Sequence, residues 1–221
     1  MQLTASGFLF DMDGTLVDST HVVEAVWSEF GERHELDPAV ILDYAHGRQA
    51  IDTVTHFLPA TDSGERAALV RALVAEELTR TDGIVEVPGA AALLDALIQA
   101  GAPVAVVTSA PRELAATRLR AAGVREPAVL VAAEDVEHGK PDPECYLLAA
   151  SRLGVPIEQC AAFEDAEAGL AAARASGARV VVIGGHSSAT TDGLVRRHDY
   201  EGLRVLPAGH GAWAVELRAA S

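Results

Sequence analysis

The chain has 221 residues, of which 49% are hydrophobic and 22% charged, and its net charge is −15. This length and composition are typical of a globular domain that carries a sizeable insertion. The negative charge predicts no nucleic-acid partner, because a phosphate backbone would be repelled. The longest apolar runs are much shorter than the ~20 residues of a membrane span, and no secretory signal is recognisable at the N-terminus. We therefore expect a cytoplasmic protein without a membrane partner.

Short apolar runs with the character of buried strands alternate with amphipathic helical patterns along most of the chain. Strands are predicted at residues 7–11, 103–108, 128–132, 160–163 and 178–183, and helices at 90–100, 112–122, 143–153 and 166–176. The four helical patterns end at Gly101, Gly123, Gly154 and Gly177, which are typical helix stops. This alternation predicts an α/β fold, in which helices flank a Rossmann-like parallel sheet.

The stretch from about residue 19 to residue 81 breaks the alternation. Val22, Val26 and Phe30 recur there at helical spacing, and no run in the stretch is a convincing strand. We therefore predict an all-helical cap domain, residues 17–83, inserted into a catalytic core made of residues 1–16 and 84–221. A short apolar run at 203–206 is a candidate edge strand.

The strongest chemical signal is the segment Asp11-Met12-Asp13-Gly14-Thr15, which follows the first core strand. In open parallel sheets, ligands bind beyond the carboxyl ends of the strands. One of the two carboxylates can attack a phosphoryl group, and the other can move a proton to or from the reacting oxygens. Gly14 lets the backbone turn tightly and present its amides to phosphate oxygens.

Thr108 and Ser109 end the second core strand, where a hydroxyl and a free amide can hold a phosphoryl oxygen. A helix cap ahead of Pro111 explains the two residues equally well. Acidic pairs follow two further strands, at Glu134-Asp135 and Glu164-Asp165.

Glu164 and Asp165 can join Asp11 around a hard cation. Mg²⁺ suits such a site because it binds a few oxygens, keeps several waters and bridges to phosphate. Without that context, the two acids would simply favour the start of the helix that follows them.

Lys140 is the only lysine of the chain, against sixteen arginines. A compact ammonium at this one place suggests a task that the broad guanidinium fork performs poorly. The residue lies in the constrained loop Gly139-Lys140-Pro141-Asp142-Pro143, ahead of a predicted helix. We expect Lys140 to neutralise the charge of an aspartate and a phosphate during phosphoryl transfer.

Taken in order, these segments resemble the four motifs of the haloacid dehalogenase superfamily, and the resemblance extends over nearly the whole chain, including the helical cap. It implies that Asp11 is the nucleophile, Asp13 the acid/base and Lys140 the group that stabilises the intermediate. It also implies a Mg²⁺ cofactor held by Asp11, Asp165 and the main-chain carbonyl of Asp13, with Glu164 as a direct or water-mediated partner. The residues implied to bind the phosphate are Met12, Gly14, Thr108, Ser109 and Lys140.

Finer comparison separates the branches of that superfamily. Asp13 argues against its dehalogenases, which lack the second acid, and a cap without lysine argues against its phosphonate hydrolases. The cap segment that contains His46 and Arg48, together with Val87-Pro88-Gly89-Ala90, is similar to bacterial sugar phosphatases and to yeast glycerol-phosphate and deoxyglucose-phosphate phosphatases.

This similarity predicts a phosphoric monoester hydrolase that acts on a small-molecule phosphate ester, namely a sugar or polyol phosphate. His46 and Arg48 would bind that substrate from the cap side, or would serve only as a capping residue and an interface residue. Three alternatives stay open: a phosphomutase similar to beta-phosphoglucomutase, a phosphoglycolate phosphatase, and a non-catalytic binding protein on the same fold. The sequence makes no prediction of the oligomeric state.

Overall fold

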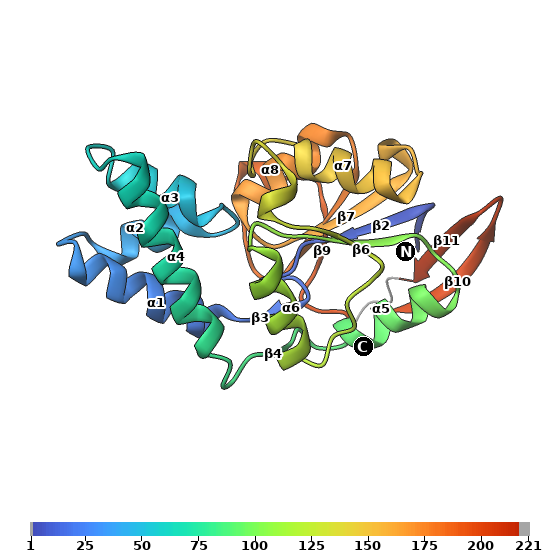
Figure 1. The fold of residues 1–221 in the computed structure, drawn as a ribbon. Helices are drawn as coiled ribbons and strands as arrows, with labels where there is room; N and C mark the ends of the chain where they lie inside the picture. The colour runs from blue at the N-terminus through green and yellow to red at the C-terminus, as the bar shows by residue number, and fades with distance from the viewer. Residues whose placement is uncertain (1, 217–221) are drawn as a thin grey trace.

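The computed structural model describes residues 2–216, and its centre is a six-stranded parallel sheet. The strands lie in the order β6 (Val129–Val131), β5 (Val104–Val107), β2 (Gly7–Phe10), β7 (Cys160–Glu164), β8 (Arg179–Ile183) and β9 (Val195–Arg197) (Figure 1). Every neighbouring pair is parallel. The five predicted core strands are confirmed, and the short β9 is an addition that the sequence did not reveal.

Helices cover both faces of this sheet. On one face, α5 (Ala90–Gln99) and α6 (Arg112–Ala121) pack against Phe8 and Phe10 of β2. On the other face, α7 (Glu144–Leu153) and α8 (Glu167–Ser176) pack against Leu9 of the same strand. The α/β fold class is therefore confirmed, together with its four helices. The glycines predicted as helix stops all have positive φ values, at Gly101, Gly123, Gly154 and Gly177.

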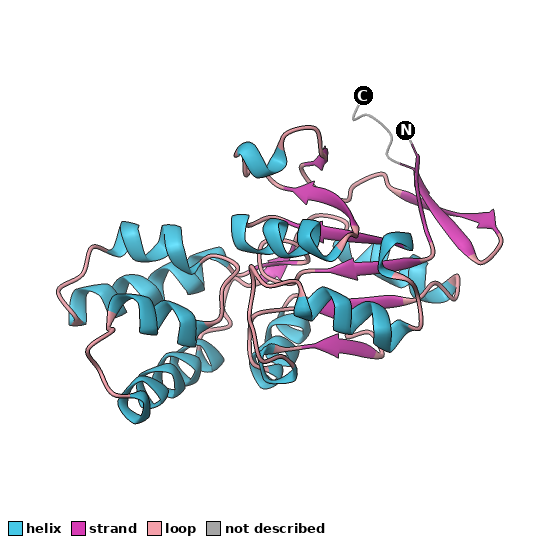
Figure 2. Cartoon of the chain, turned by 90° about the horizontal axis from the view of Figure 1, so that it is seen from above, coloured by secondary structure: helices cyan, strands magenta, loops and turns pink. Residues whose placement is uncertain are grey.

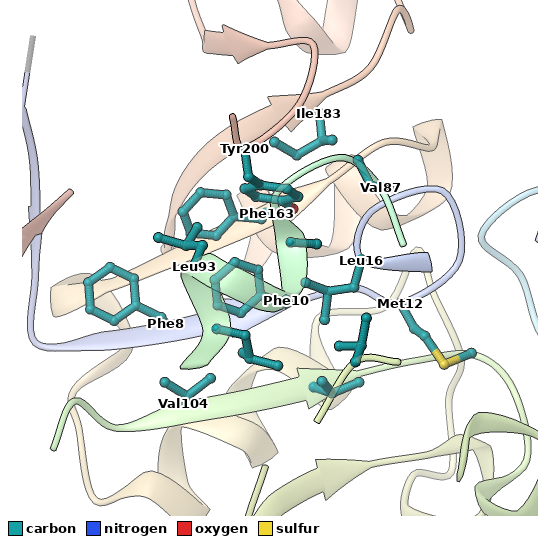
Figure 3. Packing of buried hydrophobic residues seen from close by; sticks show 14 of the residues in the cluster. Phe8, Phe10, Met12, Leu16, Val87, Leu93, Val104, Phe163, Ile183 and Tyr200 are labelled. Carbon is teal, nitrogen blue, oxygen red and sulfur yellow. The ribbon is translucent and has the colours of Figure 1, made fainter. Parts of the chain in front are cut away.

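An aromatic group packs beneath the carboxyl ends of the central strands (Figure 3). Phe10 of β2 stacks on Phe163 of β7 with ring centroids 4.5 Å apart, and Tyr200 lies 6.2 Å and 6.1 Å from the two rings. All three side chains are buried. Because Asp11 and Glu164 are the next residues of the chain after Phe10 and Phe163, this packing gives both carboxylates a rigid support.

Four helices stand beside the sheet rather than on it (Figure 2). They are α1 (Thr20–Arg33), α2 (Pro38–Ala45), α3 (Ala50–Phe57) and α4 (Ser63–Thr79). They bury an apolar cluster of their own that includes Trp27, Phe30 and Ile41. Two short strands, β3 (Val17–Asp18) and β4 (Val85–Glu86), pair antiparallel and connect these helices to the sheet.

The inserted all-helical cap is thus confirmed as part of the fold. The boundaries of the two predicted domains, 1–16 with 84–221 and 17–83, stay predictions. Residue 1 and residues 217–221 of the predicted core lie outside the described part of the chain.

The candidate at 203–206 is an edge strand, but of a sheet separate from the parallel one. Residues 204–206 belong to β10 (Arg204–Gly209), which pairs with β11 (Ala212–Glu216) in an antiparallel sheet completed by β1 (Gln2–Ala5). The edges of the parallel sheet are β6 and β9. Most of β10 is exposed, so its sequence has no strong apolar pattern that would show which sheet it joins.

No helix within residues 2–216 combines the length and the apolar character that a membrane span requires. The longest helix of this part of the chain, α4, has 17 residues, and most of its side chains contact solvent. The cytoplasmic location stays a prediction.

The acidic pair after β6 has a structural role. Glu134 accepts hydrogen bonds from the Arg112 amide, 3.2 Å from each of its carboxylate oxygens, at the start of α6. Asp135 accepts from the Ala132 amide at 2.8 Å, from Arg152 at 2.8 Å and from the Arg112 side chain. The hydrogen bond from Arg152 holds the pKa of Asp135 below its usual value. This cluster ties α6 and α7 to the end of β6.

Asp135→Asn should lower the free energy of unfolding at pH 7 by about 1 kcal/mol. A carboxylate with a depressed pKa stabilises the fold above its unfolded pKa of about 4 and loses that effect as the pH falls through the folded value. In urea unfolding, the difference between wild type and variant should therefore be smaller at pH 3 than at pH 7. Asp192→Asn, at an exposed position, is the control. A difference that stayed constant or widened in acid would contradict this assignment.

Candidate active site

The two acidic motifs meet because of the sheet topology. Strand β2 lies between β5 and β7. From β2 the chain adds β5 and β6 on one side of the sheet and then β7, β8 and β9 on the other, and ligands of open α/β folds bind where the strand order reverses in this way. In the register, Phe10 faces Phe163, and the Asp11 amide donates to the Phe163 carbonyl at 3.0 Å. Asp11 and Glu164 consequently lie side by side at the carboxyl edge.

Lys140 joins the ends of three strands. Its ammonium donates to Asp11 Oδ1 at 2.5 Å, to Glu164 Oε1 at 2.6 Å and to the Val107 carbonyl at 3.2 Å, which uses its three protons. The side chain is only 2% exposed. Burial alone would lower the pKa of Lys140, but the charges of Asp11 and Glu164 outweigh burial and hold that pKa above its usual range. The lysine is therefore a fixed cation.

Glu164 is fully buried and held from several sides. Besides Lys140, Oε1 accepts from the Tyr146 hydroxyl at 2.7 Å, and Oε2 accepts from the Asp165 amide at 3.1 Å. Its carboxylate also occupies the space above Gly169, where a methyl group would lie 1.8 Å from Oε1. Only glycine at position 169 leaves room for the carboxylate in this place.

Asp11, Glu164 and Asp165 form an acidic cluster whose ligand atoms lie within 4.8 Å of one another. Thr15 donates to Asp165 at 3.0 Å. Burial, followed by the charge of Glu164, raises the pKa of Asp11 to about 7, although Lys140 opposes the shift. Burial and the charges of Asp11 and Glu164 likewise raise the pKa of Asp165.

Three carboxylates facing one lysine leave an excess of negative charge. Oxygen donors gathered in this way suit a hard divalent cation. Gly14 adds to the fit, because a side chain there would lie 2.0 Å from Asp165 Oδ2 and displace that carboxylate from the cluster. The residues present thus fit a metal site.

Asp13 projects from the loop between β2 and β3, and both of its oxygens have partners. Ser19 donates to Oδ1 at 2.6 Å and Arg118 donates to Oδ2 at 2.8 Å. Arg118 in turn lies 3.4 Å from Glu77 of α4. Burial raises the pKa of Glu77, and the Arg118 charge opposes that rise.

A cavity of about 110 Å³ lies between the cap helices and the sheet, and it brings most of the predicted site residues together. Its core wall includes Asp11, Asp13, Gly14, Thr108, Ser109, Arg118 and Asp165, and its cap wall includes His46, Arg48 and Glu77. Lys140 and Glu164 lie behind Asp11, buried away from the cavity. The Met12 side chain is part of the apolar core, so the contact with phosphate implied for Met12 can involve only its main chain.

Thr108 and Ser109 do not cap α6, whose first turn follows Pro111 without a side-chain cap. The Thr108 hydroxyl accepts from the Ala110 amide at 3.0 Å, and Ser109 donates to the carbonyl of Gly47 in the cap at 2.8 Å. Arg48 lies over the Tyr44 ring, 4.4 Å from its centroid. The interpretation of Thr108 and Ser109 as caps of α6 is therefore wrong. The Ser109 hydroxyl instead connects the core to the cap.

Several residues of the site were not predicted. Tyr146 and Ser19 follow no recognisable pattern in the sequence. Arg118 and Glu77 left a detectable signal, since each lies on the buried face of its helix: Arg118 follows Leu114 by four positions, and Glu77 follows Leu73 by four. A charged residue in an apolar stripe is uncommon enough to be noted.

A family model described as haloacid dehalogenase-like hydrolase matches residues 5–177. The chain belongs to this family. The hydrolase is 44% identical to hexitol phosphatase A of Escherichia coli K12, over 82% of its own length and 84% of that protein. It is 32% identical to glycerol-1-phosphate phosphohydrolase 2 of Saccharomyces cerevisiae, over 83% and 76% of the two chains.

Among solved structures, a hydrolase from Pseudomonas syringae has a TM-score of 0.75 and 26% identity, covering 86% of this hydrolase and 91% of that chain. The predicted family and enzyme class are therefore confirmed. The roles assigned to individual site residues stay predictions.

Gly169→Ala should destabilise the hydrolase by about 1–3 kcal/mol, because the new methyl group would overlap the Glu164 carboxylate. Helix propensity alone predicts the opposite sign, since alanine favours a helix interior over glycine by about 1 kcal/mol. Thermal unfolding measures the difference. Gly185→Ala is the control, because its methyl group meets no atom within 4 Å. An alanine at 169 that left the melting temperature unchanged would contradict the packing of Glu164.

Proposed function

We propose that this hydrolase is a Mg²⁺-dependent phosphatase that removes phosphate from a small phosphomonoester through an aspartyl phosphate on Asp11. Sugar and polyol phosphates are the proposed substrate class. The observation that carries the proposal is the position of Asp11 on the cavity wall, held by Lys140 and close to a second carboxylate, Asp13. The substrate class is supported by the relatives named as hexitol and glycerol-1-phosphate phosphatases.

The residues proposed to hold Mg²⁺ are Asp11, Asp165 and the main-chain carbonyl of Asp13, with Glu164 as a direct or water-mediated partner. When bound, the cation supplies positive charge that offsets the oxygens of the transferring phosphoryl group. Lys140 supplies a permanent positive charge in contact with Asp11 and Glu164. Together they allow a carboxylate to approach an anionic phosphate.

The transfer takes place in two steps. A carboxylate oxygen of Asp11 forms a bond to phosphorus, while the bond from phosphorus to the ester oxygen breaks. Asp13 gives a proton to the departing alkoxide. Asp13 then takes a proton from water, which attacks the aspartyl phosphate and releases inorganic phosphate and free Asp11.

The substrate enters between cap and core. Gly14, Thr108, Ser109 and the main chain at Met12 are the proposed phosphate ligands on the core side. His46 and Arg48 line the cavity from the cap side, where they can meet the hydroxyl groups of a sugar or polyol. The paired strands β3 and β4 are the place where the cap can rotate to open and close the cavity.

Purified hydrolase should release phosphate from sugar and polyol monophosphates in the presence of Mg²⁺, and chelation should abolish the release. The assay compares these esters with phosphoglycolate, nucleotide monophosphates, and beta-glucose 1-phosphate plus its bisphosphate. Preference for phosphoglycolate would redefine the substrate class. Conversion of beta-glucose 1-phosphate into glucose 6-phosphate with little free phosphate would instead identify a mutase, and absence of turnover on every ester would argue for a binding protein.

Asp11→Asn should reduce turnover at least about 10³-fold, because an amide is a poor nucleophile. Loss of activity alone also fits a role in metal binding, so the covalent product must be sought directly. Acid quenching of the wild type during turnover should leave one phosphoryl group on the peptide that contains Asp11, as measured by mass spectrometry. The variant should lack it. Near-normal turnover by the variant would exclude the mechanism.

A further inference from the structure

Arg118 is a buried cation that the mechanism above does not use. It lies on α6 with 3% of its surface exposed, on the same helix face as Leu114, Ala115 and Leu119. Its guanidinium donates to Asp13 Oδ2 at 2.8 Å and lies 3.4 Å from Glu77 Oε2. Arg118 therefore connects a loop residue of the core with helix α4 of the cap.

Stability does not explain why an arginine occupies this place. Removing charges from water has a large cost, and apolar residues of similar volume often replace buried ion pairs without loss of stability. Arg118 also leaves Nε buried without a hydrogen bond in the described structure, and its Nη2 has only the 3.4 Å contact with Glu77. Native proteins seldom leave buried donors unpaired, and such a case calls for another explanation.

The contact with Asp13 offers that explanation. The loop carboxylate is 29% exposed, and rotation about its last side-chain bond has a broad energy minimum. Ser19 and Arg118 engage one oxygen each and thereby set the orientation of the carboxylate. A general acid must lie within hydrogen-bond reach of the oxygen it protonates, so this orientation matters for catalysis.

Glu77 makes the arrangement depend on the cap. It is 8% exposed and belongs to α4, whereas Asp13 and Arg118 belong to the core. A movement of α4 away from α6 would take one of the two anions away from the guanidinium. The position of the cap is thus transmitted to Arg118, and through Arg118 to Asp13.

We propose that Arg118 is a positioning residue for Asp13, and that Glu77 makes this positioning depend on where cap helix α4 lies relative to the core. The inference rests on the proposed function, in which Asp13 protonates the leaving alkoxide. It predicts that loss of Arg118 slows phosphoryl transfer by an amount that depends on the leaving group of the ester. An alkyl phosphate needs the proton from Asp13 when its bond to phosphorus breaks, whereas p-nitrophenolate departs as a stable anion.

The experiment measures the single-turnover rate at which Asp11 becomes phosphorylated. The substrates are p-nitrophenyl phosphate and the sugar or polyol ester that the wild type hydrolyses fastest. Arg118→Met should slow the alkyl ester at least about tenfold and the aryl ester less than about threefold. Arg118→Lys, which keeps a charge but reaches fewer partners, should recover part of the loss. Arg120→Met, on an exposed position of the same helix, should match the wild type on both esters.

Glu77→Gln tests the coupling to the cap. It keeps the direct contact between Arg118 and Asp13 but removes the charge on α4 that faces Arg118, so it should slow the alkyl ester more than the aryl ester, though less than Arg118→Met does. Equal effects on the two esters would overturn the coupling to the cap. An equal loss on both esters in both Arg118 variants would show a merely structural role and overturn the proposal. No loss in either variant would overturn it as well. If the wild type hydrolyses no phosphate ester, the proposed function itself fails.

Discussion

The site depends on one buried interaction, the ammonium of Lys140 held between Asp11 and Glu164. Separately, each of these groups would be costly to bury, because a charge in a low-dielectric interior needs a partner. Together with the Val107 carbonyl, they satisfy one another across the ends of three strands. A planar guanidinium cannot aim three donors at three converging acceptors in this way, which accounts for a lysine here in a chain that otherwise uses arginine.

Most of the fold follows from local patterns of the sequence. Parallel strands buried on both faces have continuous apolar runs, and each of the four core helices is followed by a glycine, so the alternating core could be predicted. The small antiparallel sheet could not. Its strand β10 is exposed and so has no strong apolar pattern, and its strands β1 and β11 pair although they are far apart in sequence, so that pairing is decided by tertiary contacts.

Some residues of the site could likewise be predicted from the sequence, and others could not. Asp11, Asp13 and Asp165 were predictable because strand ends of a parallel sheet meet at one edge, and Lys140 because it is the only lysine of the chain. Tyr146 was not, because a tyrosine within a helix has no special signature, yet its hydroxyl helps to hold Glu164. The contact that the Ser109 hydroxyl makes with the Gly47 carbonyl of the cap was not predicted either. Such contacts depend on how the two parts of the chain meet.

The surroundings of each acidic pair decide its role. Glu134-Asp135 and Glu164-Asp165 both follow core strands, and their sequences alone do not distinguish them. In the first pair, Asp135 forms ion pairs with Arg112 and Arg152 and Glu134 accepts from the Arg112 amide, so the pair ties helices to the sheet. The second pair lies beside Asp11, where one lysine faces three carboxylates and negative charge remains. An acidic pair at a strand end therefore indicates a cation site only where the nearby side chains leave its charge uncompensated.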